Sequence, residues 1–363
     1  MSRPDQEDLF SERRAEGEDA DRDGPGGTRR LRSSDRAYFG QPFRDFENVG
    51  GVHLTDSVLW CDGDRKNGLN FVSSAVAAEV GRDRKVLCTE ATLRLFGKNK
   101  RLPDALTAPF GHAIRVGALG LSLHQAGFIL GAAQLRIERE GRVIVYARDV
   151  CPRASTVAPS AEPVPCDVLA LAATHGGRLD RFPAREGVIE EIVRFVDASL
   201  EAKRPPVLLA ERLRVAPDLA ILLGRAGYRL RLHRAVADVL KLHEGLGVAV
   251  PAFKRLGKKP TRGDVVIAPP ILRTNLSATL PEARMALVGP RATDAAHVHQ
   301  LGVAEAFPLA NVADQAELLA FVEATGAREV FLTGGKVEEL GAALTATGRV
   351  VRDLRPQQQL SLF

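Results

Sequence analysis

Histidine side chains are the first candidates for metal chemistry in this chain. His297 and His299 are separated by one residue in a segment expected to be helical, and no carboxylate follows them before Gly302. Two side chains at positions i and i+2 of a helix do not share a face. The other histidines are scattered along the sequence: His53, His112, His124, His175, His233 and His243. We therefore interpret the histidines as polar core or surface residues rather than as metal ligands.

The composition indicates a folded chain with one large or two medium cores. The sequence has 363 residues, 45% of them hydrophobic, and a net charge of +5 that mildly favours anionic partners. Four cysteines have no metal or redox spacing and are expected to be reduced thiols: Cys61, Cys88, Cys151 and Cys166. No apolar run approaches the ~20 residues of a membrane span, and the N-terminus is too acidic for a signal peptide. We expect a cytoplasmic, nucleoid-associated bacterial protein without a membrane partner.

The C-terminal peptide combines a polar residue with apolar anchors: Gln359, Leu360, Ser361, Leu362 and Phe363. It resembles the peptide by which bacterial replication and repair proteins bind the DNA polymerase sliding clamp. In that family the glutamine bonds to a pocket rim, and the leucine and phenylalanine fill an apolar pocket. The resemblance predicts a flexible clamp-binding tail over residues 356–363. The alternative is that these side chains fold back onto their own core.

A second, weaker copy of the pattern lies near the N-terminus at Gln6, Asp8, Leu9 and Phe10, with Glu7 in place of the first leucine. Residues 1–45 are charged, glycine-rich and poor in aliphatic side chains, so we expect a disordered tail. Two tethers on one ring-shaped clamp would raise the apparent affinity above that of either peptide alone. The alternative is a chance dipeptide or a folded-back tail.

Between the tails, short apolar runs alternate with helical patterns, which predicts an α/β fold with mixed strand types. Strands are expected at 57–61, 68–73, 85–88, 119–124, 134–138, 142–146, 167–172, 206–210, 228–232, 265–268, 285–288, 306–308, 329–333 and 349–354. Helices are expected at 89–96, 187–201, 217–226, 313–325 and 336–347. Thr89 is the expected N-cap of the first helix, and Gly326 is expected to end the fourth.

The order of these segments resembles the metallo-β-lactamase fold carrying a β-CASP cap, in particular the bacterial exonuclease associated with an ATP-dependent DNA ligase. The matching stretches are residues 122–134, 145–149, 167–176 and 307–314. The resemblance implies an αββα sandwich in two parts, residues 46–185 and 285–355, with an inserted α/β cap over residues 186–284. It also implies a two-metal site for zinc or manganese that cleaves DNA.

The positions where that family carries metal ligands are occupied here by other residue types. They are Ser74, Val76, Ala78, Glu79, Phe128, Ala172, Val312 and Gly334, and Asp149 alone keeps an aspartate. Valine, alanine and phenylalanine cannot bind a metal, and one lone aspartate cannot hold two divalent ions. We therefore expect no metal cofactor and no catalytic residues, with Asp149 paired to the neighbouring Arg148.

Loss of metal ligands does not remove phosphate contacts, which come from lysine, arginine and backbone donors. The predicted cap is rich in basic residues, and in active relatives the groove beside it receives a nucleic acid strand. The candidates for DNA binding are Arg212, Arg214, Arg234, Lys254, Arg255, Lys258 and Lys259. The run 254–260 is expected to be an exposed basic loop. The alternative is a solvated surface rich in arginine.

These patterns favour a catalytically inactive nuclease fold that serves DNA repair or replication and is recruited by the sliding clamp. One alternative is a metal-dependent DNA exonuclease with atypical ligands, which would use zinc or manganese. The other is a non-catalytic partner subunit of an active paralogue. An active nuclease paralogue or a DNA ligase is therefore a further candidate partner beside the clamp and DNA.

Overall fold

The structure is a computed structural model, and it describes residues 45–48, 50–63, 68–77, 85–96, 105–257, 260–303 and 305–356. These residues all belong to one compact unit, residues 45–363. The predicted α/β fold is confirmed, with three sheets among the described residues. No described helix is both long and apolar enough to cross a lipid bilayer.

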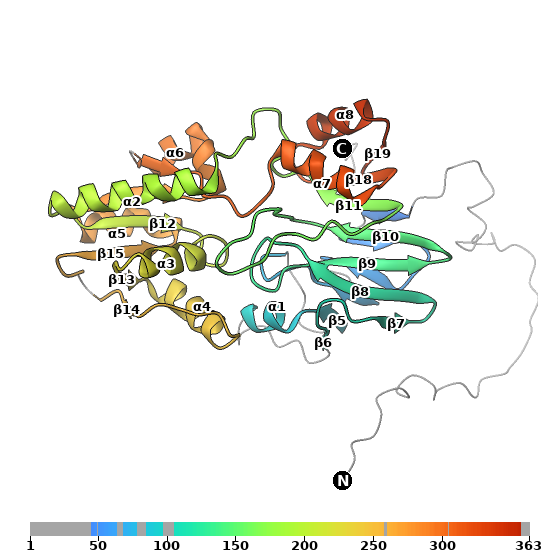
Figure 1. Ribbon diagram of the computed structural model, residues 1–363, viewed down its shortest axis with the longest axis horizontal. Coiled ribbons are helices and arrows are strands. Elements are labelled where there is room, and N and C mark those ends of the chain that lie inside the picture. The colour runs from blue at the N-terminus through green and yellow to red at the C-terminus, as the bar shows by residue number, and fades with distance from the viewer. Residues whose placement is uncertain are drawn as a thin grey trace, which may run out of the picture. The chain divides into compact units, whose positions relative to one another are not determined.

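Two of the sheets pack against each other and form a sandwich (Figure 1). The first sheet contains, in spatial order, β1 (Phe46–Asn48), β2 (Val52–Leu54), β3 (Leu59–Cys61), β4 (Leu69–Phe71), β5 (Lys85–Cys88) and β6 (Ala105–Thr107). The second contains β19 (Val350–Asp353), β18 (Glu329–Thr333), β11 (Val168–Ala172), β10 (Arg142–Ala147), β9 (Ala133–Arg139), β8 (Leu119–Gln125) and β7 (Ile114–Val116).

Alternating apolar residues of both sheets form the core of the sandwich. Along β8, Leu119, Leu121 and Leu123 are buried, and they pack with Leu59 and Phe71 of the first sheet. Helix α1 (Glu90–Leu95) covers the outer face of the first sheet, and α7 (Gln315–Thr325) and α8 (Val337–Ala346) cover the outer face of the second. The layers are therefore helix, sheet, sheet, helix.

The third sheet is entirely parallel and is called the parallel sheet below. Its strands, in spatial order, are β14 (Phe253–Arg255), β13 (Arg229–Leu232), β15 (Asp264–Ala268), β12 (Pro206–Ala210), β16 (Arg284–Val288) and β17 (Glu305–Phe307). One face packs on α2 (Arg185–Glu201), α3 (Ala216–Arg225) and α4 (Arg234–Glu244), and the other on α5 (Arg273–Thr279) and α6 (Ala295–Leu301). Helices on both faces explain why its central strands, β15 and β12, are buried along their whole length.

Helix caps follow the sequence expectations. The Thr89 side chain caps α1 by accepting a hydrogen bond from the Thr92 backbone N–H at 3.1 Å. Gly326 ends α7 in the left-handed conformation, with φ +69°, as expected for glycine at a helix C-terminus. The sequence predictions did not include α4 and α5, nor the three-residue strands β1, β2, β6 and β7. Helix α5 and the four strands are too short to carry a clear pattern, whereas α4 has 11 residues and buries Val236, Val239 and Leu240 at a helical spacing that was overlooked.

One sequence expectation is corrected in the parallel sheet. Lys254 and Arg255 belong to strand β14 rather than to an exposed loop, because their backbone pairs with Arg231 and Leu232 of β13. The segment was too polar to be recognised as a strand from its side chains. An edge strand needs only one partner and tolerates lysine and arginine, which also block further pairing.

A buried ionic contact ties the parallel sheet's helices to the second sheet's loops. The Arg185 guanidinium at the start of α2 donates to the Asp218 carboxylate of α3 at 2.5 Å. Thr156, which follows β10 in sequence, donates to the same carboxylate from its backbone N–H at 2.9 Å and its hydroxyl at 2.7 Å. Asp218 therefore has each of its oxygens satisfied although the residue is only 3% exposed.

Candidate functional site

The positions where the resemblance expects metal ligands lie on loops at the ends of the sandwich strands. Ser74 and Val76 follow β4, and Phe128 lies between β8 and β9. Asp149 follows β10, Ala172 ends β11, Val312 precedes α7 and Gly334 follows β18. Ala78 and Glu79 lie outside the described residues. The described positions therefore all lie at strand ends or on connecting loops, and their side chains decide what the site can do.

The loop that carries Phe128 is held tightly in place. The hydroxyls of Thr89 and Thr92 both donate to the Gly131 carbonyl, at 2.7 and 2.9 Å. Gly127 has φ +71°, and a Cβ atom there would lie 2.1 Å from the Cys151 carbonyl oxygen. Only glycine fits this close approach. The backbone thus fixes the Phe128 ring, which is 2% exposed.

Phe128 is the centre of an apolar cluster that fills the space between the loops, called the apolar plug below. The plug consists of the buried residues Ala75, Leu95, Ala126, Phe128, Ile129, Ala132, Val239 and Val312, with Val76, Leu130, Phe182, Leu213 and Leu242 packed against them. Three expected ligand positions, Val76, Phe128 and Val312, are therefore in one hydrophobic cluster. Their side chains exclude water and offer no donor atom to a cation.

The plug joins the sandwich loops to the elements of the parallel sheet. Val239 and Leu242 come from α4, and Leu213 comes from the loop after β12. The Arg214 guanidinium carbon stands 4.9 Å from the centroid of the Phe128 ring. On the other side, the Asn311 amide donates to the Phe128 carbonyl at 3.0 Å. Side chains of the sandwich loops and of the parallel sheet's elements therefore pack around Phe128, while Val76, Leu213 and Arg214 also line an open cavity.

The carboxylate of Asp62, which directly follows β3, is buried. It accepts hydrogen bonds from the Ser73 backbone N–H at 2.8 Å, the Ser73 hydroxyl at 2.6 Å and the Tyr146 hydroxyl at 3.0 Å. The Arg148 guanidinium lies 3.6 Å from the same carboxylate. Burial raises the pKa of Asp62 above its usual value, and the positive charge of Arg148 opposes that rise.

Arg148 provides the positive charge that these carboxylates require. Its Nη1 lies 3.6 Å from Asp62, and its Nε lies 3.6 Å from Asp149, whose side chain is 20% exposed. A single guanidinium thus serves two acidic side chains at the place where the resemblance expects metal ions. Asp62 and Tyr146 are not among the site residues predicted from the sequence. The available signal was an acidic residue directly after an apolar strand whose neighbour, β4, also ends at this edge.

The remaining polar groups do not complete a metal site. His175 lies on the loop after β11 and packs edge-on to Phe182, with ring centroids 5.3 Å apart. Burial lowers the pKa of His175, and the charge of Arg214 lowers it further. Within the described ranges, no three histidine, cysteine, aspartate or glutamate side chains are grouped as metal ligands. The donor set at this site does not fit a pair of divalent ions.

The candidate DNA-binding residues lie at the carboxyl edge of the parallel sheet. Arg212 and Arg214 line an open cavity of about 530 Å³ that extends from Val76 past His233 to Pro270. Arg234 begins α4. Arg255 ends β14 and forms an ion pair with Asp238 of α4, while Lys254 precedes it in the strand. Lys258 and Lys259 lie outside the described residues.

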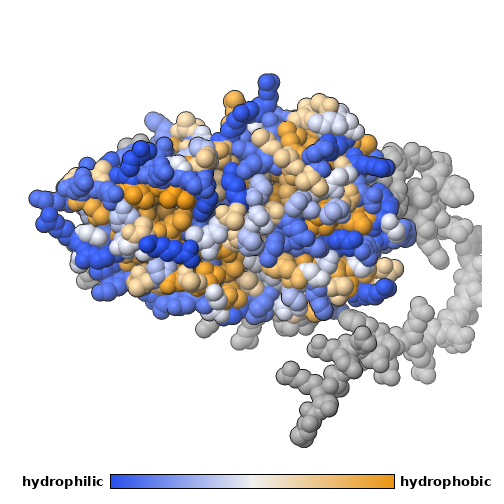
Figure 2. Space-filling view, viewed as in Figure 1, coloured by the Kyte–Doolittle hydropathy of each residue, from blue (hydrophilic) through white to orange (hydrophobic). Residues whose placement is uncertain are grey.

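Other basic residues lie at the opposite, amino edge of the same sheet. Arg225 ends α3, Arg229 begins β13 and Arg262 precedes β15. Helix α2 ends at this edge, where hydrophilic side chains gather at the left of the view in Figure 2. The arginines of this region therefore divide into two groups, and only the carboxyl-edge group adjoins the apolar plug.

The two terminal peptides, Gln6–Phe10 and Gln359–Phe363, lie outside the described residues. Their proposed binding to a sliding clamp remains a prediction.

Comparison with known proteins gives partial matches. No family model matches this sequence. A probable DNA ligase of Opitutus terrae is 28% identical over 319 residues, which cover 86% of this chain and 31% of that protein. A ribonuclease of Thermus thermophilus is 31% identical over 122 residues, 33% of this chain and 28% of that protein. The chain therefore spans about a third of the length of these relatives.

A solved structure shares the fold at low sequence identity. A protein of unknown function from Enterococcus faecalis superposes with a TM-score of 0.51 at 11% identity, covering 73% of this chain and 74% of that chain. At this identity the likeness concerns the fold alone.

Proposed function

We propose that this chain is a non-catalytic member of the metallo-β-lactamase nuclease family with a β-CASP cap. In this proposal it acts as an accessory factor in DNA repair or replication and is recruited through its terminal peptides to the sliding clamp. The observation that carries the proposal is the apolar plug, which places Val76, Phe128 and Val312 in one hydrophobic cluster. Apolar side chains at these three positions offer no ligand to a metal ion.

Two further observations support the proposal. Arg148 supplies to Asp62 and Asp149 the positive charge that metal ions would supply in an active relative. The partial matches to a probable DNA ligase and to a ribonuclease favour nucleic acid as the partner. In this proposal the folded part of the chain does not cleave nucleic acid, and the C-terminal peptide recruits it to the sliding clamp.

Clamp binding is tested with the purified full chain and the sliding clamp in a surface-binding measurement. Leu362→Ala/Phe363→Ala removes the C-terminal anchors, and Leu9→Ala/Phe10→Ala removes the N-terminal ones. The matched control is Leu179→Ala/Ile271→Ala, which removes two apolar side chains that are 94% and 89% exposed on the folded part. We expect binding to fall with the C-terminal variant and to vanish when both peptides are changed. Unchanged binding by the fourfold variant would reject the tether.

Catalysis is tested separately on the same protein. Nuclease assays on single- and double-stranded DNA with manganese and with zinc should show no cleavage above background, and metal analysis should find no bound metal. Cleavage that is abolished by Asp149→Asn would instead establish the alternative, a metal-dependent exonuclease with atypical ligands. Clamp binding and cleavage are independent measurements, so each part of the proposal can fail alone.

A further inference from the structure

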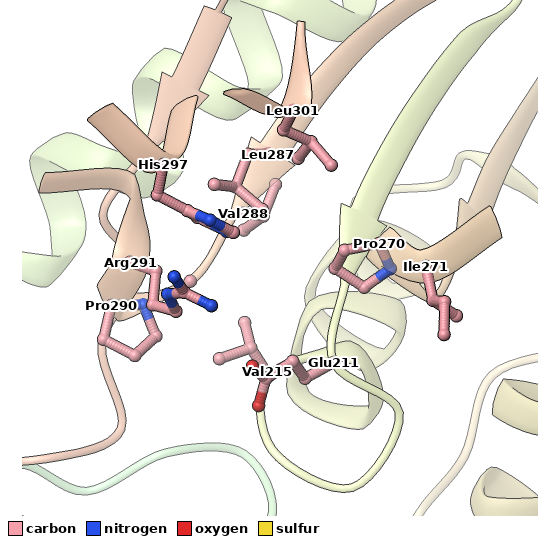
Figure 3. A pocket seen from close by; sticks show the side chains of 11 residues that line it. Glu211, Val215, Pro270, Ile271, Leu287, Val288, Pro290, Arg291, His297 and Leu301 are labelled. Atoms are coloured by element: carbon pink, nitrogen blue, oxygen red, sulfur yellow. The ribbon is translucent and has the colours of Figure 1, made fainter. Parts of the chain in front are cut away.

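A second cavity, of about 270 Å³, lies at the carboxyl edge of the parallel sheet. Its apolar walls come from Val215, Pro270, Leu287, Val288 and Leu301. Figure 3 shows the side chains of Arg291 and His297 side by side at one wall, with Pro270 across the cavity and Glu211 between the two sides. This cavity adjoins the larger open one, because Glu211, Pro270 and Ile271 line both.

The topology of the sheet makes this edge a natural binding position. The chain leaves β12 through α3 toward β13 on one side, and it leaves β16 through α6 toward β17 on the other. Helices α3 and α6 cover opposite faces of the sheet. Adjacent strands whose connections diverge in this way open a crevice beyond their carboxyl ends, where α/β proteins bind ligands. Residues following β12 and β16 line the cavity at this point.

Two polar side chains of the cavity, Arg291 and His297, are available to a ligand, whereas Glu211 pairs with Arg214. In the described part of the chain, neither the Arg291 nor the His297 side chain has a hydrogen bond or ion pair with another residue, and the hydrogen bond from His297 to the Asp294 carboxylate is made by its backbone N–H. Gly289 precedes them with φ 149° and ψ 177°, a conformation that is almost restricted to glycine. A Cβ atom there would contact only Val215, at 3.9 Å, so the conformation rather than crowding requires glycine. This turn carries Pro290 and Arg291 to the rim.

We infer that this cavity binds a single nucleotide, held through its phosphate by Arg291 and His297. A guanidinium fork matches phosphate oxygens in a bidentate geometry, and an imidazole adds a neighbouring donor. The apolar walls suit a planar base, and the Glu211 carboxylate can accept from an amine or hydroxyl group. Glu211 also lies 3.5 Å from Arg214, which links the cavity to the apolar plug. Two ligands present the same phosphate, sugar and base to the cavity: a free nucleotide and the phosphorylated end of a DNA strand.

Isothermal titration of the full chain with adenosine 5′-monophosphate tests the inference, with adenosine and inorganic phosphate as component ligands. We expect saturable binding of the nucleotide and weaker binding of either component. Arg291→Ala should lower the nucleotide affinity about tenfold or more, because a charge-assisted bidentate contact is lost. His297→Ala should lower it less. Arg225→Ala is the matched control, since it removes an equally exposed arginine at the opposite edge of the sheet.

A second arm compares an oligonucleotide carrying a 5′-phosphate with the same strand carrying a 5′-hydroxyl group. Arg291-dependent preference for the phosphorylated strand, without binding of the free nucleotide, would identify the strand end as the source. If neither ligand depends on Arg291, or if Arg225→Ala causes the same loss, the inference is wrong. The inference does not depend on clamp recruitment or on the absence of cleavage, so its failure would leave the proposed function untouched.

Discussion

The guanidinium of Arg214 stacks on the ring of Phe128, with 4.9 Å between the guanidinium carbon and the ring centroid. The contact joins the loop after β12 of the parallel sheet to the loop between β8 and β9 of the sandwich. Cation–π contacts of this kind strengthen when water is excluded, as it is beside the apolar plug. The position where the resemblance expects a metal-binding histidine therefore serves here to hold two parts of the fold together.

Replacing Phe128 with alanine should strongly destabilise the protein. Removal of a buried phenylalanine side chain leaves a cavity and typically costs about 3–5 kcal/mol. Urea unfolding followed by circular dichroism measures the change in the free energy of unfolding. Leu106→Ala is the control, because Leu106 is 47% exposed and leaves no cavity. A cost for Phe128→Ala similar to that of the control would show that the plug is not part of the core.

Arg148→Ala should destabilise the protein by about 2 kcal/mol or more at neutral pH, because Asp62 would keep a buried charge without a cation. Burial already raises the pKa of Asp62, and loss of Arg148 would raise it further. A carboxyl group whose pKa is higher in the native state than in the unfolded state contributes stability at pH values below its unfolded pKa. That contribution is lost as pH rises through the native pKa. The deficit of the variant should therefore be largest near neutral pH and shrink toward about pH 4.

The control for this prediction is a double-mutant cycle. Asp62→Asn removes the charge while keeping an acceptor for the Ser73 backbone N–H. The double variant Asp62→Asn/Arg148→Ala should be more stable than the sum of the two single effects predicts, because no unpaired charge remains. Additive effects that do not vary with pH would mean that Arg148 does not compensate Asp62.

Much of the fold follows from the sequence, because its strands are bounded apolar runs. Strands such as β5 and β18 begin and end where their patterns predict, and Thr89 and Gly326 carry recognisable cap chemistry. Strand order is different: β15 pairs between β12 and β13, although it follows both in the chain. Nothing in the local pattern of β15 encodes that position, which depends on the packing of α3 and α4.

The site was predictable only in part, for a related reason. The family resemblance of the sequence places valine or phenylalanine at three expected ligand positions, which predicts loss of metal binding there. That Leu213, Val239 and Leu242 reach the same place depends on tertiary packing. The role of Arg148 toward Asp62 is also hidden, because the residues are 86 positions apart and each is unremarkable in its own segment.

Lowering the pH below neutrality should reduce the stability of the protein through His243, which is buried, and through the partly buried His175 and His233. Burial lowers the pKa values of His175, His233 and His243 below the usual 6.5. A histidine whose pKa is lower in the native state than in the unfolded state contributes stability at pH values above its unfolded pKa. That contribution is lost as pH falls through the native pKa. The free energy of unfolding should therefore begin to decrease as pH falls toward the usual pKa of about 6.5 and should continue to decrease as pH falls through the lowered native pKa values, with the largest contribution from the fully buried His243.

The variant His243→Gln tests this prediction. His243 is 1% exposed and its Nδ1 lies 2.9 Å from the Val239 carbonyl oxygen, a contact that a glutamine amide can replace. The variant should show a shallower fall in stability with pH than the unmodified protein. His112→Gln, at an exposed position, controls for the loss of one imidazole. An unchanged pH dependence in His243→Gln would contradict the assignment.

We expect DNA to bind along the carboxyl edge of the parallel sheet. Removal of arginines at that edge should then weaken direct DNA contacts, and removal of arginines at the amino edge should not. Arg212 and Arg234 are exposed at that edge, and no other described residue pairs with their side chains. Arg225 and Arg262 are equally exposed at the amino edge, so Arg225→Ala/Arg262→Ala changes the net charge by the same amount. The long-range electrostatic attraction between protein and DNA should weaken equally in the two variants. Direct contacts with DNA phosphates should be lost only in the carboxyl-edge variant.

Fluorescence anisotropy with labelled DNA at several salt concentrations measures that difference. Each phosphate contact contributes about 1 to the slope of log affinity against log salt, because it releases about one counterion. Arg212→Ala/Arg234→Ala should therefore reduce the slope by about 2, and the amino-edge variant should leave it close to that of the unmodified protein. Equal slopes for the two variants would show that DNA does not lie along the carboxyl edge, whatever its overall affinity.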